Sequence, residues 1–311
     1  MHTLLSILLT VAVAWLVTAC NGGGGMNSGV VPVPFTSFSA VKSGQPVQAN
    51  GISQTVSATT TGLGVVTGTN VNAVDTANTM AQVTYGSIPA MNQFSFTTPA
   101  SSVSFSTTNV LCPGGTGTCT GSNSTSSATV MNPLTPPTPA WNYQSFGYWL
   151  VITSGTTRIA GAISFGSPTP LVSIPAGGTA TYSGLSQGTY IDQAGATWTE
   201  SASMLSTANF NLGTRSVSFS TSGTQISRTV AGVMTMNLAP ELNLTGNLAI
   251  SGGQFTGVVT APGGGASGAS PMSGGAVGQF YGPNALEIGG VYSLKGLGTQ
   301  TMLGGFGGKQ P

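Results

Sequence analysis

The sequence has little charge, one histidine and few cysteines, and each shortage excludes a class of function. Only 4% of the 311 residues are charged, with six Lys and Arg against five Asp and Glu, whereas about 25% is usual in soluble domains. Six scattered cations cannot form a basic patch, so we expect no nucleic-acid partner. The one histidine is His2, which leaves the rest of the chain without histidine for acid–base catalysis or metal binding. We therefore predict neither an enzyme nor a cofactor.

Three short patterns resemble catalytic or phosphate-binding motifs but lack the context that those motifs need. "GLSQG" at 184–188 matches a nucleophile elbow, but no helix follows it, so we interpret it as a turn. "GGGASG" at 263–268 matches a phosphate-binding loop without a helix behind it, so we interpret it as a loop between strands. Asp192 and Glu200 are eight residues apart, and we interpret them as solvated acids rather than a catalytic pair.

The N-terminus has the pattern of an export signal. The apolar run from Leu4 ends at Cys20, which is shorter than the roughly 20 residues of a membrane span and typical of a signal-peptide core. Residues 17–20, "VTAC", resemble the bacterial lipobox. That resemblance implies cleavage before Cys20 and its acylation with palmitate-type chains, and Asn21 favours sorting to the outer membrane. An ordinary secretory signal and an uncleaved anchor remain the alternatives.

We accordingly predict a lipoprotein signal peptide over residues 1–19 and a Gly-rich tether over residues 20–30. The expected lipid partner is the outer membrane, reached through the acylated Cys20. Export places the rest of the chain in an oxidising compartment, where Cys112 and Cys119 of "CPGGTGTC" should form a disulfide. A two-thiolate metal site is the alternative, but no other ligands lie near it in the sequence.

Alternating segments dominate the rest of the sequence and predict an all-β protein. "SSVSFSTT" at 101–108 and "RSVSFSTS" at 215–222 each place Val and Phe on one face and Ser or Thr on the other. Residues 94–109 and 209–223 resemble each other, and each reads as a hairpin. Only 53–62 and 77–85 are candidates for a turn of helix. Short strands bounded by Gly, Pro and Asn are typical of sandwiches and barrels.

The composition changes between residues 164 and 184, where Pro168 and Pro170 interrupt strand pairing. We predict a β domain over 31–170 and a second β domain over 171–311. About eight strand candidates follow the boundary, and closing them into a barrel needs bends that glycine provides. The many glycines near the end of the chain fit that requirement.

A family resemblance supports this barrel. "GQFYGPNALEIGGVYSL" at 278–294 and "LGGFGGKQ" at 303–310 resemble the closing strands of the barrel domain of transferrin-binding protein B, which recurs in factor H-binding protein and related Gram-negative surface lipoproteins. The resemblance implies an N-terminal handle-like β domain followed by a C-terminal eight-stranded antiparallel β-barrel. The residues that carry the motif are Gly278, Phe280, Tyr281, Gly282, Pro283, Glu287, Gly289 and Gly290.

Two details of the motif have structural consequences. We expect Gly282, Pro283 and Asn284 to form a turn, and the Glu287 carboxylate to accept backbone N–H bonds near it. A solvated Glu287 is the alternative. Upstream, five aromatic residues cluster within 141–149, and we assign most to a core, with contact to a partner as the alternative.

The predicted function is non-catalytic binding by an outer-membrane, surface-exposed lipoprotein. By resemblance, the ligand is a macromolecule such as a host glycoprotein or a haem or metal carrier protein. One alternative is a structural or adhesive surface protein without a soluble ligand. Another is an integral outer-membrane barrel, against which we note the "GGKQP" end and strands that look shorter than the roughly 9–11 residues that span a membrane.

Overall fold

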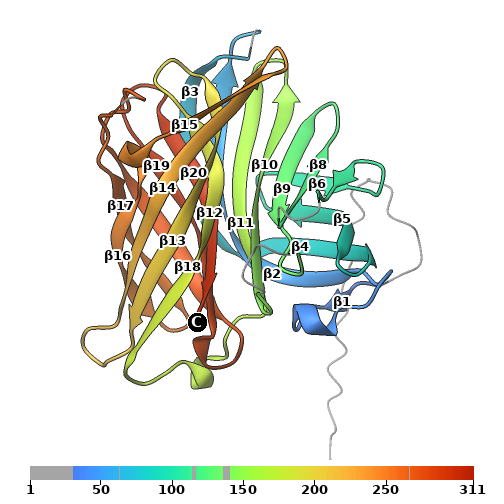
Figure 1. Ribbon diagram of the computed structural model, residues 1–311, viewed down its shortest axis with the longest axis vertical. Helices are drawn as coiled ribbons and strands as arrows, with labels where there is room; N and C mark the ends of the chain where they lie inside the picture. The colour runs from blue at the N-terminus through green and yellow to red at the C-terminus, as the bar shows by residue number, and fades with distance from the viewer. Residues whose placement is uncertain (1–30, 63, 114–116, 136–140, 266) are drawn as a thin grey trace, which may run out of the picture.

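The computed structural model describes residues 31–62, 64–113, 117–135, 141–265 and 267–311. It is built almost entirely of β-strands, arranged as two sheets that lie side by side (Figure 1). Its helical content, within the described residues, consists of four single turns of 3₁₀-helix, which are Phe38–Ala40, Leu171–Ser173, Pro240–Leu242 and Pro283–Ala285. In the described part of the chain, no helix is long and apolar enough to cross a membrane.

The first sheet has eleven strands and curls into a nearly closed barrel. Its order is β6-β5-β4-β2-β11-β10-β9-β8-β7, and β1 and β3 also pair with β2. The centre of the sheet is the long pairing of β2 with β11, which joins residues about a hundred positions apart. The strands are β1 Val33–Pro34, β2 Val47–Thr60, β3 Val66–Val71, β4 Asp75–Ser87, β5 Ala90–Thr97, β6 Ser102–Phe105, β7 Val110–Leu111, β8 Thr118–Ser122, β9 Ser126–Met131, β10 Gln144–Ser154 and β11 Thr157–Gly166.

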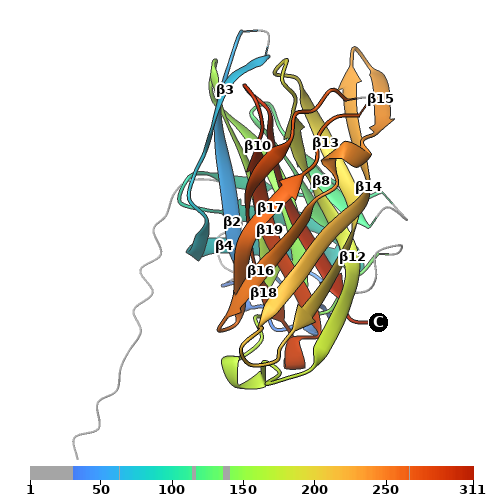
Figure 2. The same cartoon turned by 90° about the vertical axis from the view of Figure 1, so that its left-hand side faces the viewer.

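The second sheet closes on itself as an eight-stranded antiparallel barrel, as predicted. Its order is β13-β12-β20-β19-β18-β17-β16-β14, and β13 also pairs with β14, which closes the cylinder. β15 is a ninth strand. It pairs with the C-terminal part of β14 and extends beyond the barrel wall (Figure 2). The strands are β12 Thr179–Ile191, β13 Thr197–Asn209, β14 Ser216–Val230, β15 Val233–Leu238, β16 Thr245–Ser251, β17 Gln254–Ala261, β18 Met272–Tyr281, β19 Glu287–Lys295 and β20 Thr301–Lys309.

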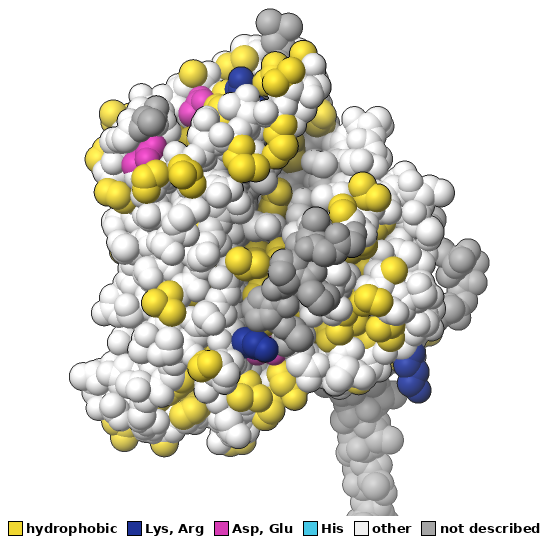
Figure 3. Space-filling view, in the orientation of Figure 1, with side chains coloured by type: hydrophobic (Ala, Val, Ile, Leu, Met, Phe, Trp, Pro, Cys, Tyr) yellow, Lys and Arg dark blue, Asp and Glu magenta, His cyan; other side chains and the backbone are white. Residues whose placement is uncertain are grey.

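Alternation decides which face of each barrel strand is buried. In β13, Ala202, Met204 and Ala208 point into the barrel, while Ser203 and Leu205 between them are exposed. Inside, the apolar residues form one core that is rich in aromatic rings. On the face shown in Figure 3, the surface is mostly uncharged polar side chains and backbone. An apolar interior and a polar exterior are the polarity of a barrel that faces water.

The structure corrects three of the sequence-based expectations. The two segments considered for a helical turn, 53–62 and 77–85, lie mainly in β2 and β4, where the sheet buries several of their Ser and Thr side chains. "GLSQG" is not a turn but the middle of β12. The strands are also longer than the sequence indicated, with 13 residues in β12 and 15 in β14, so strand length does not argue against a membrane barrel, and only the polarity of the faces does.

Candidate binding surface between the two sheets

The two sheets are joined by a carboxylate that accepts three backbone hydrogen bonds. Glu287 lies at the start of β19, after the turn at Gly282–Ala285 that the sequence predicted. Its Oε1 accepts the N–H of Asn142 at 2.6 Å, and its Oε2 accepts the N–H groups of Tyr143 and Gln144 at 2.9 Å each. Burial raises the pKa of Glu287, while these three bonds and nearby Lys309 act in the opposite direction. The carboxylate thus accepts backbone donors as expected, but they belong to the first sheet.

The other motif residues divide between the junction and the barrel core. Phe280 points inward, and its ring lies 5.3 Å from each of the rings of Phe210 and Phe255. Tyr281, the next residue, points outward, and its hydroxyl is 2.8 Å from the Ser164 hydroxyl of β11. The period of two in β18 therefore gives one aromatic to the barrel core and the next to the junction.

The glycines of the motif make room for neighbouring groups. A side chain at Gly278 would overlap the ring of Phe255 inside the barrel, and one at Gly290 would meet Phe306. On the opposite face, a Cβ at Gly289 would lie 2.6 Å from the Ser164 hydroxyl. Gly282 has a positive φ of 72° and lies against the Tyr143 ring, so both its backbone and its surroundings require glycine. Pro283 begins the short 3₁₀ turn.

An apolar layer completes the junction. Ile52, Val56 and Ala162 of the first sheet pack against Val291 and Leu303 of the barrel, and all five are buried. The Lys295 ammonium of the barrel also donates a hydrogen bond to the Thr69 carbonyl of the first sheet, at 2.8 Å. Together with the Glu287 bonds, these contacts join the two sheets.

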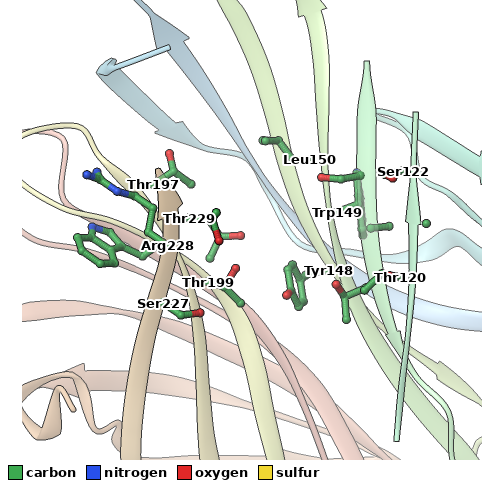
Figure 4. Close-up of a pocket in the computed structure, with 16 residues that line it drawn as sticks. Thr120, Ser122, Tyr148, Trp149, Leu150, Thr197, Thr199, Ser227, Arg228 and Thr229 are labelled. Carbon is green, nitrogen blue, oxygen red and sulfur yellow. The ribbon is translucent and has the colours of Figure 1, made fainter. Parts of the chain in front are cut away.

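A groove with a volume of about 430 Å³ runs between the sheets beside that layer, against which two of its lining residues, Tyr148 and Leu150, pack. On one wall, Thr120, Ser122 and Tyr148 come from β8 and β10; on the other, Thr199 and Ser227 come from β13 and β14 (Figure 4). Most of the lining side chains carry hydroxyl groups, because each strand turns its polar face outward here. Hydroxyls that both donate and accept suit a ligand that is recognised by many uncharged hydrogen bonds.

One cation lies beside this groove, with its side chain on the face of β14 that turns toward the barrel, where Trp198 packs against the barrel core. The guanidinium of Arg228 stacks over the indole of Trp198, 4.8 Å from the ring centroid. The indole N–H in turn donates to the Asp192 carboxylate at 2.9 Å. Contacts of this kind hold planar side chains in fixed orientations and are enriched at binding surfaces. Asp192 therefore positions an aromatic ring and is not paired with Glu200.

Tyr148 of β10 reaches from its wall of the groove toward the barrel. Burial raises the pKa of its phenol, which is hydrogen-bonded to Thr129 of the first sheet and Thr199 of the barrel. Its neighbour Trp149 points the other way into the core of the first sheet, and Trp141 and Phe146 are also buried. The aromatic cluster is thus mainly core, as predicted, and Tyr148 reaches the groove.

The barrel interior holds a buried chain of hydrogen-bonded polar side chains. Glu200, interpreted from the sequence as solvated, is fully buried, and its Oε2 accepts the Tyr292 hydroxyl at 2.7 Å. The same hydroxyl lies 2.8 Å from that of Ser186, the serine of "GLSQG". Burial raises the pKa of Glu200 to about 7, against the smaller lowering from the Tyr292 bond. Within the described residues, no three His, Cys, Asp or Glu side chains are grouped to bind a metal ion.

The predicted cysteine pair is confirmed, since Cys119 of β8 forms a disulfide with Cys112, the residue that follows β7. Cys20 and the rest of the predicted signal and tether lie outside the described residues. The Arg228–Trp198–Asp192 arrangement was missed by sequence reasoning. Its only signal in the sequence is that Asp192 and Trp198 lie at or near the two ends of the loop that joins β12 to β13.

Comparison with protein families matches residues 174–310, somewhat less than half of the chain, to a family described as the C-lobe and N-lobe beta barrels of Tf-binding protein B. Comparison with curated proteins finds no match. The described barrel strands β12 to β20 all fall within the matched range. The C-terminal part of the chain is thus a barrel of the type that the sequence resemblance indicated.

Solved structures with a similar fold include two transferrin-binding proteins. A mutant transferrin-binding protein B from Haemophilus parasuis Hp5 is 18% identical, with a TM-score of 0.48, over 83% of this chain and 45% of that one. The isotype 1 protein from serogroup B Neisseria meningitidis is 17% identical, with a TM-score of 0.46, over 84% and 43%. A surface lipoprotein is 15% identical, with a TM-score of 0.42, over 84% and 98%. The chain spans less than half the length of the first two.

Proposed function

Because the chain carries a transferrin-binding protein B-like β-barrel in residues 174–310, we propose that it is a surface lipoprotein that binds a macromolecule without catalysis. The observation that carries this proposal is the hydroxyl-lined groove between the two joined sheets, with Arg228 stacked on Trp198 beside it. A scaffold that presents an aromatic, a cation and many hydroxyls is suited to hold a protein or glycoprotein surface.

In this proposal each part of the chain has a separate task. Residues 1–19 direct export, Cys20 is acylated and anchors the protein in the outer membrane, and residues 20–30 form a flexible tether. The sheets of residues 31–170 and 171–311 act as handle and barrel and present the groove to the cell exterior. Two or more acyl chains give stable anchoring where a single chain is marginal.

The ligand is proposed by class only. Two of the similar structures are transferrin-binding proteins, and a host glycoprotein or an iron or haem carrier fits a groove of hydroxyls. The formal net charge of +1 gives little electrostatic steering, so we expect association to be slow and only weakly dependent on salt.

The test is a binding assay on cells that express the full chain, with fluorescent host plasma glycoproteins and transferrin as probes. Arg228→Glu reverses the charge beside the groove and should abolish binding of any probe that the native chain retains. Lys42→Glu makes the same charge change at an exposed residue of the loop between β1 and β2 and should bind normally. Equal binding by both variants would contradict a role for the groove.

Saturable binding of a probe distinguishes the proposed specific binder from a structural or adhesive surface protein. A specific binder should show saturable uptake of one probe, competed by the unlabelled protein. A structural or adhesive surface protein should retain no single soluble probe, and cells should instead lose attachment when the chain is deleted. Incorporation of labelled palmitate into the native chain but not into Cys20→Ala tests the anchor.

A further inference from the structure

The β14–β15 hairpin has an open edge. The barrel closes through its other eight strands, so of the described strands of this sheet only β15 (Val233–Leu238) has a single neighbour. All six of its residues are exposed. The hairpin extends at the upper right of Figure 2, beyond the barrel wall. Open edges are sites of pairing with a further strand.

The turn of the hairpin fixes which backbone groups face outward. Ala231 and Gly232 have positive φ angles of 50° and 80°, and they connect Val230 to Val233, which lie opposite each other. This is a two-residue loop of the type I′ kind, in which the flanking residues exchange both hydrogen bonds. Along β15, alternate residues then bond to β14, and those between them point away.

A hydrogen bond at the other end of β15 confirms which residues of the strand bond to β14. The Ala239 N–H donates to the Thr224 carbonyl at 2.8 Å, and position 239 belongs to the same alternate series as 233. Met234, Met236 and Leu238 therefore direct their N–H and C=O groups away from β14, and no described residue bonds to them. Three consecutive outward-facing positions are enough to pair with a short strand.

The side chains at these positions are apolar and uncovered. Met234, Met236 and Leu238 share one face of the hairpin and are exposed by 60%, 57% and 68%. Edge strands are normally protected by a charged side chain or a proline, and β15 has neither. The one charge on the paired part of β14, Arg228, lies over Trp198 on the opposite face from the three apolar side chains.

We propose that β15 pairs antiparallel with β15 of a second copy of this chain, around a two-fold axis at Met236. In this register Met236 lies opposite Met236 of the second copy, and Met234 lies opposite Leu238. All three outward-facing residues of each strand then exchange hydrogen bonds, and six apolar side chains form one patch on one face. A shift by two residues leaves fewer outward groups paired.

Other properties of the chain favour a second copy over a different partner. The strand matches itself, both in its hydrogen-bonding positions and in its apolar face, and this is what a two-fold interface requires. A hollow of about 450 Å³ between Met236, Leu238 and Ser267 leaves room beside the edge. With a net charge of +1, two copies hardly repel each other. The paired segment is short, and interfaces below roughly 1,200 Å² are typical of weak complexes, so the dimer should depend on concentration.

Cysteine cross-linking tests the register. The full chain, with Cys20→Ser to remove the competing thiol, is prepared in detergent with either Met236→Cys or Met234→Cys and mildly oxidised. Met236 lies opposite itself, so its variant should form a covalent dimer on non-reducing gels. Met234 lies opposite Leu238, so its variant should form several-fold less. Equal cross-linking of the two variants, or none in either, would overturn the proposal.

Sedimentation of the full chain over a hundredfold range of concentration tests the pairing itself. The native chain should shift from monomer to dimer. Met236→Pro removes an outward N–H that β14 does not use and should remain monomeric, while Met236→Val should still dimerise. A native chain that stays monomeric would overturn the proposal and leave the edge to an extended segment of another protein, and a Met236→Pro variant that dimerises would overturn it too.

Discussion

The buried carboxyl of Glu200 should make the barrel less stable as the pH rises through neutrality. Its pKa is about 7 in the folded chain against an ordinary value of 4.5, so the folded state binds the proton more tightly than the unfolded state. For a group whose pKa is raised by folding, the stabilisation is fully present below the unfolded pKa and is lost as the pH rises through the folded pKa.

The magnitude follows from that difference in pKa. One pKa unit corresponds to about 1.4 kcal/mol, so the difference between 4.5 and about 7 corresponds to about 3 kcal/mol. About 2.5 kcal/mol of this should be lost between pH 5 and pH 8. Domains of this kind are stable by only about 5–15 kcal/mol, so the loss is easily measured.

The assay is urea unfolding followed by tryptophan fluorescence at several pH values between 5 and 8. Glu200→Gln keeps an oxygen that accepts the Tyr292 hydroxyl but cannot ionise, and it leaves the other titrating groups in place. The free energy of unfolding of the native chain should fall by about 2.5 kcal/mol relative to this variant across the range. Tyr292→Phe removes the bond that lowers the pKa of Glu200. In this variant the free energy of unfolding should therefore fall at a higher pH. The same pH dependence in the native chain and in Glu200→Gln would refute the reasoning.

Three further predictions concern the junction and the disulfide. Glu287→Ala leaves the N–H groups of residues 142–144 without their acceptor, and should lower the free energy of unfolding by about 3 kcal/mol or more, measured in urea. Replacing both Cys112 and Cys119 with Ser opens a short loop and should cost about 2.5 kcal/mol, measured in the same way. Gly305→Leu should part the two sheets, since even a Cβ there would lie 3.1 Å from a ring of the first sheet, and should speed hydrogen exchange in β11 and β20.

Each of these has a control. Glu241→Ala removes another partly bonded acid far from the junction and should cost less than Glu287→Ala. Reduction of the native chain should reproduce the loss seen with the double serine variant, and no change on reduction would contradict a stabilising disulfide. Gly62→Leu, at an exposed turn with open space around it and no positive φ, should leave the exchange of β11 unchanged.

Alternation in the sequence was enough to predict the strands and the barrel, because one face of each strand is buried. Val103 and Phe105 point inward from β6, and Val217 and Phe219 from β14, as their spacing indicated. The same parity would have predicted the position of Glu200, which shares a face with Ala202 and Met204. Its charge led to the wrong interpretation, because buried acids are rare.

Contacts between distant segments could not be predicted from local patterns. The pairing of β2 with β11 joins segments about a hundred residues apart, and the bonds that Glu287 accepts from residues 142–144 join segments still farther apart in the sequence. The groove has no motif of its own, since it exists only where those contacts place β10 beside β13 and β14. Glycines were predicted to bend strands, and the packing of Phe255 against Gly278 shows that they also make room for large rings.

Controlled release from intact cells tests the proposed surface lipoprotein most directly. A cleavage site for a sequence-specific protease replaces Gly22–Gly25 in the full chain, and the protease is added to whole cells. The protease should release the handle–barrel unit from cells that carry the chain with Cys20. Cells that express the Cys20→Ala variant should carry no bound chain before the protease is added. A chain that is cleaved only after the cells are lysed, or that stays attached equally with and without Cys20, would contradict the proposal.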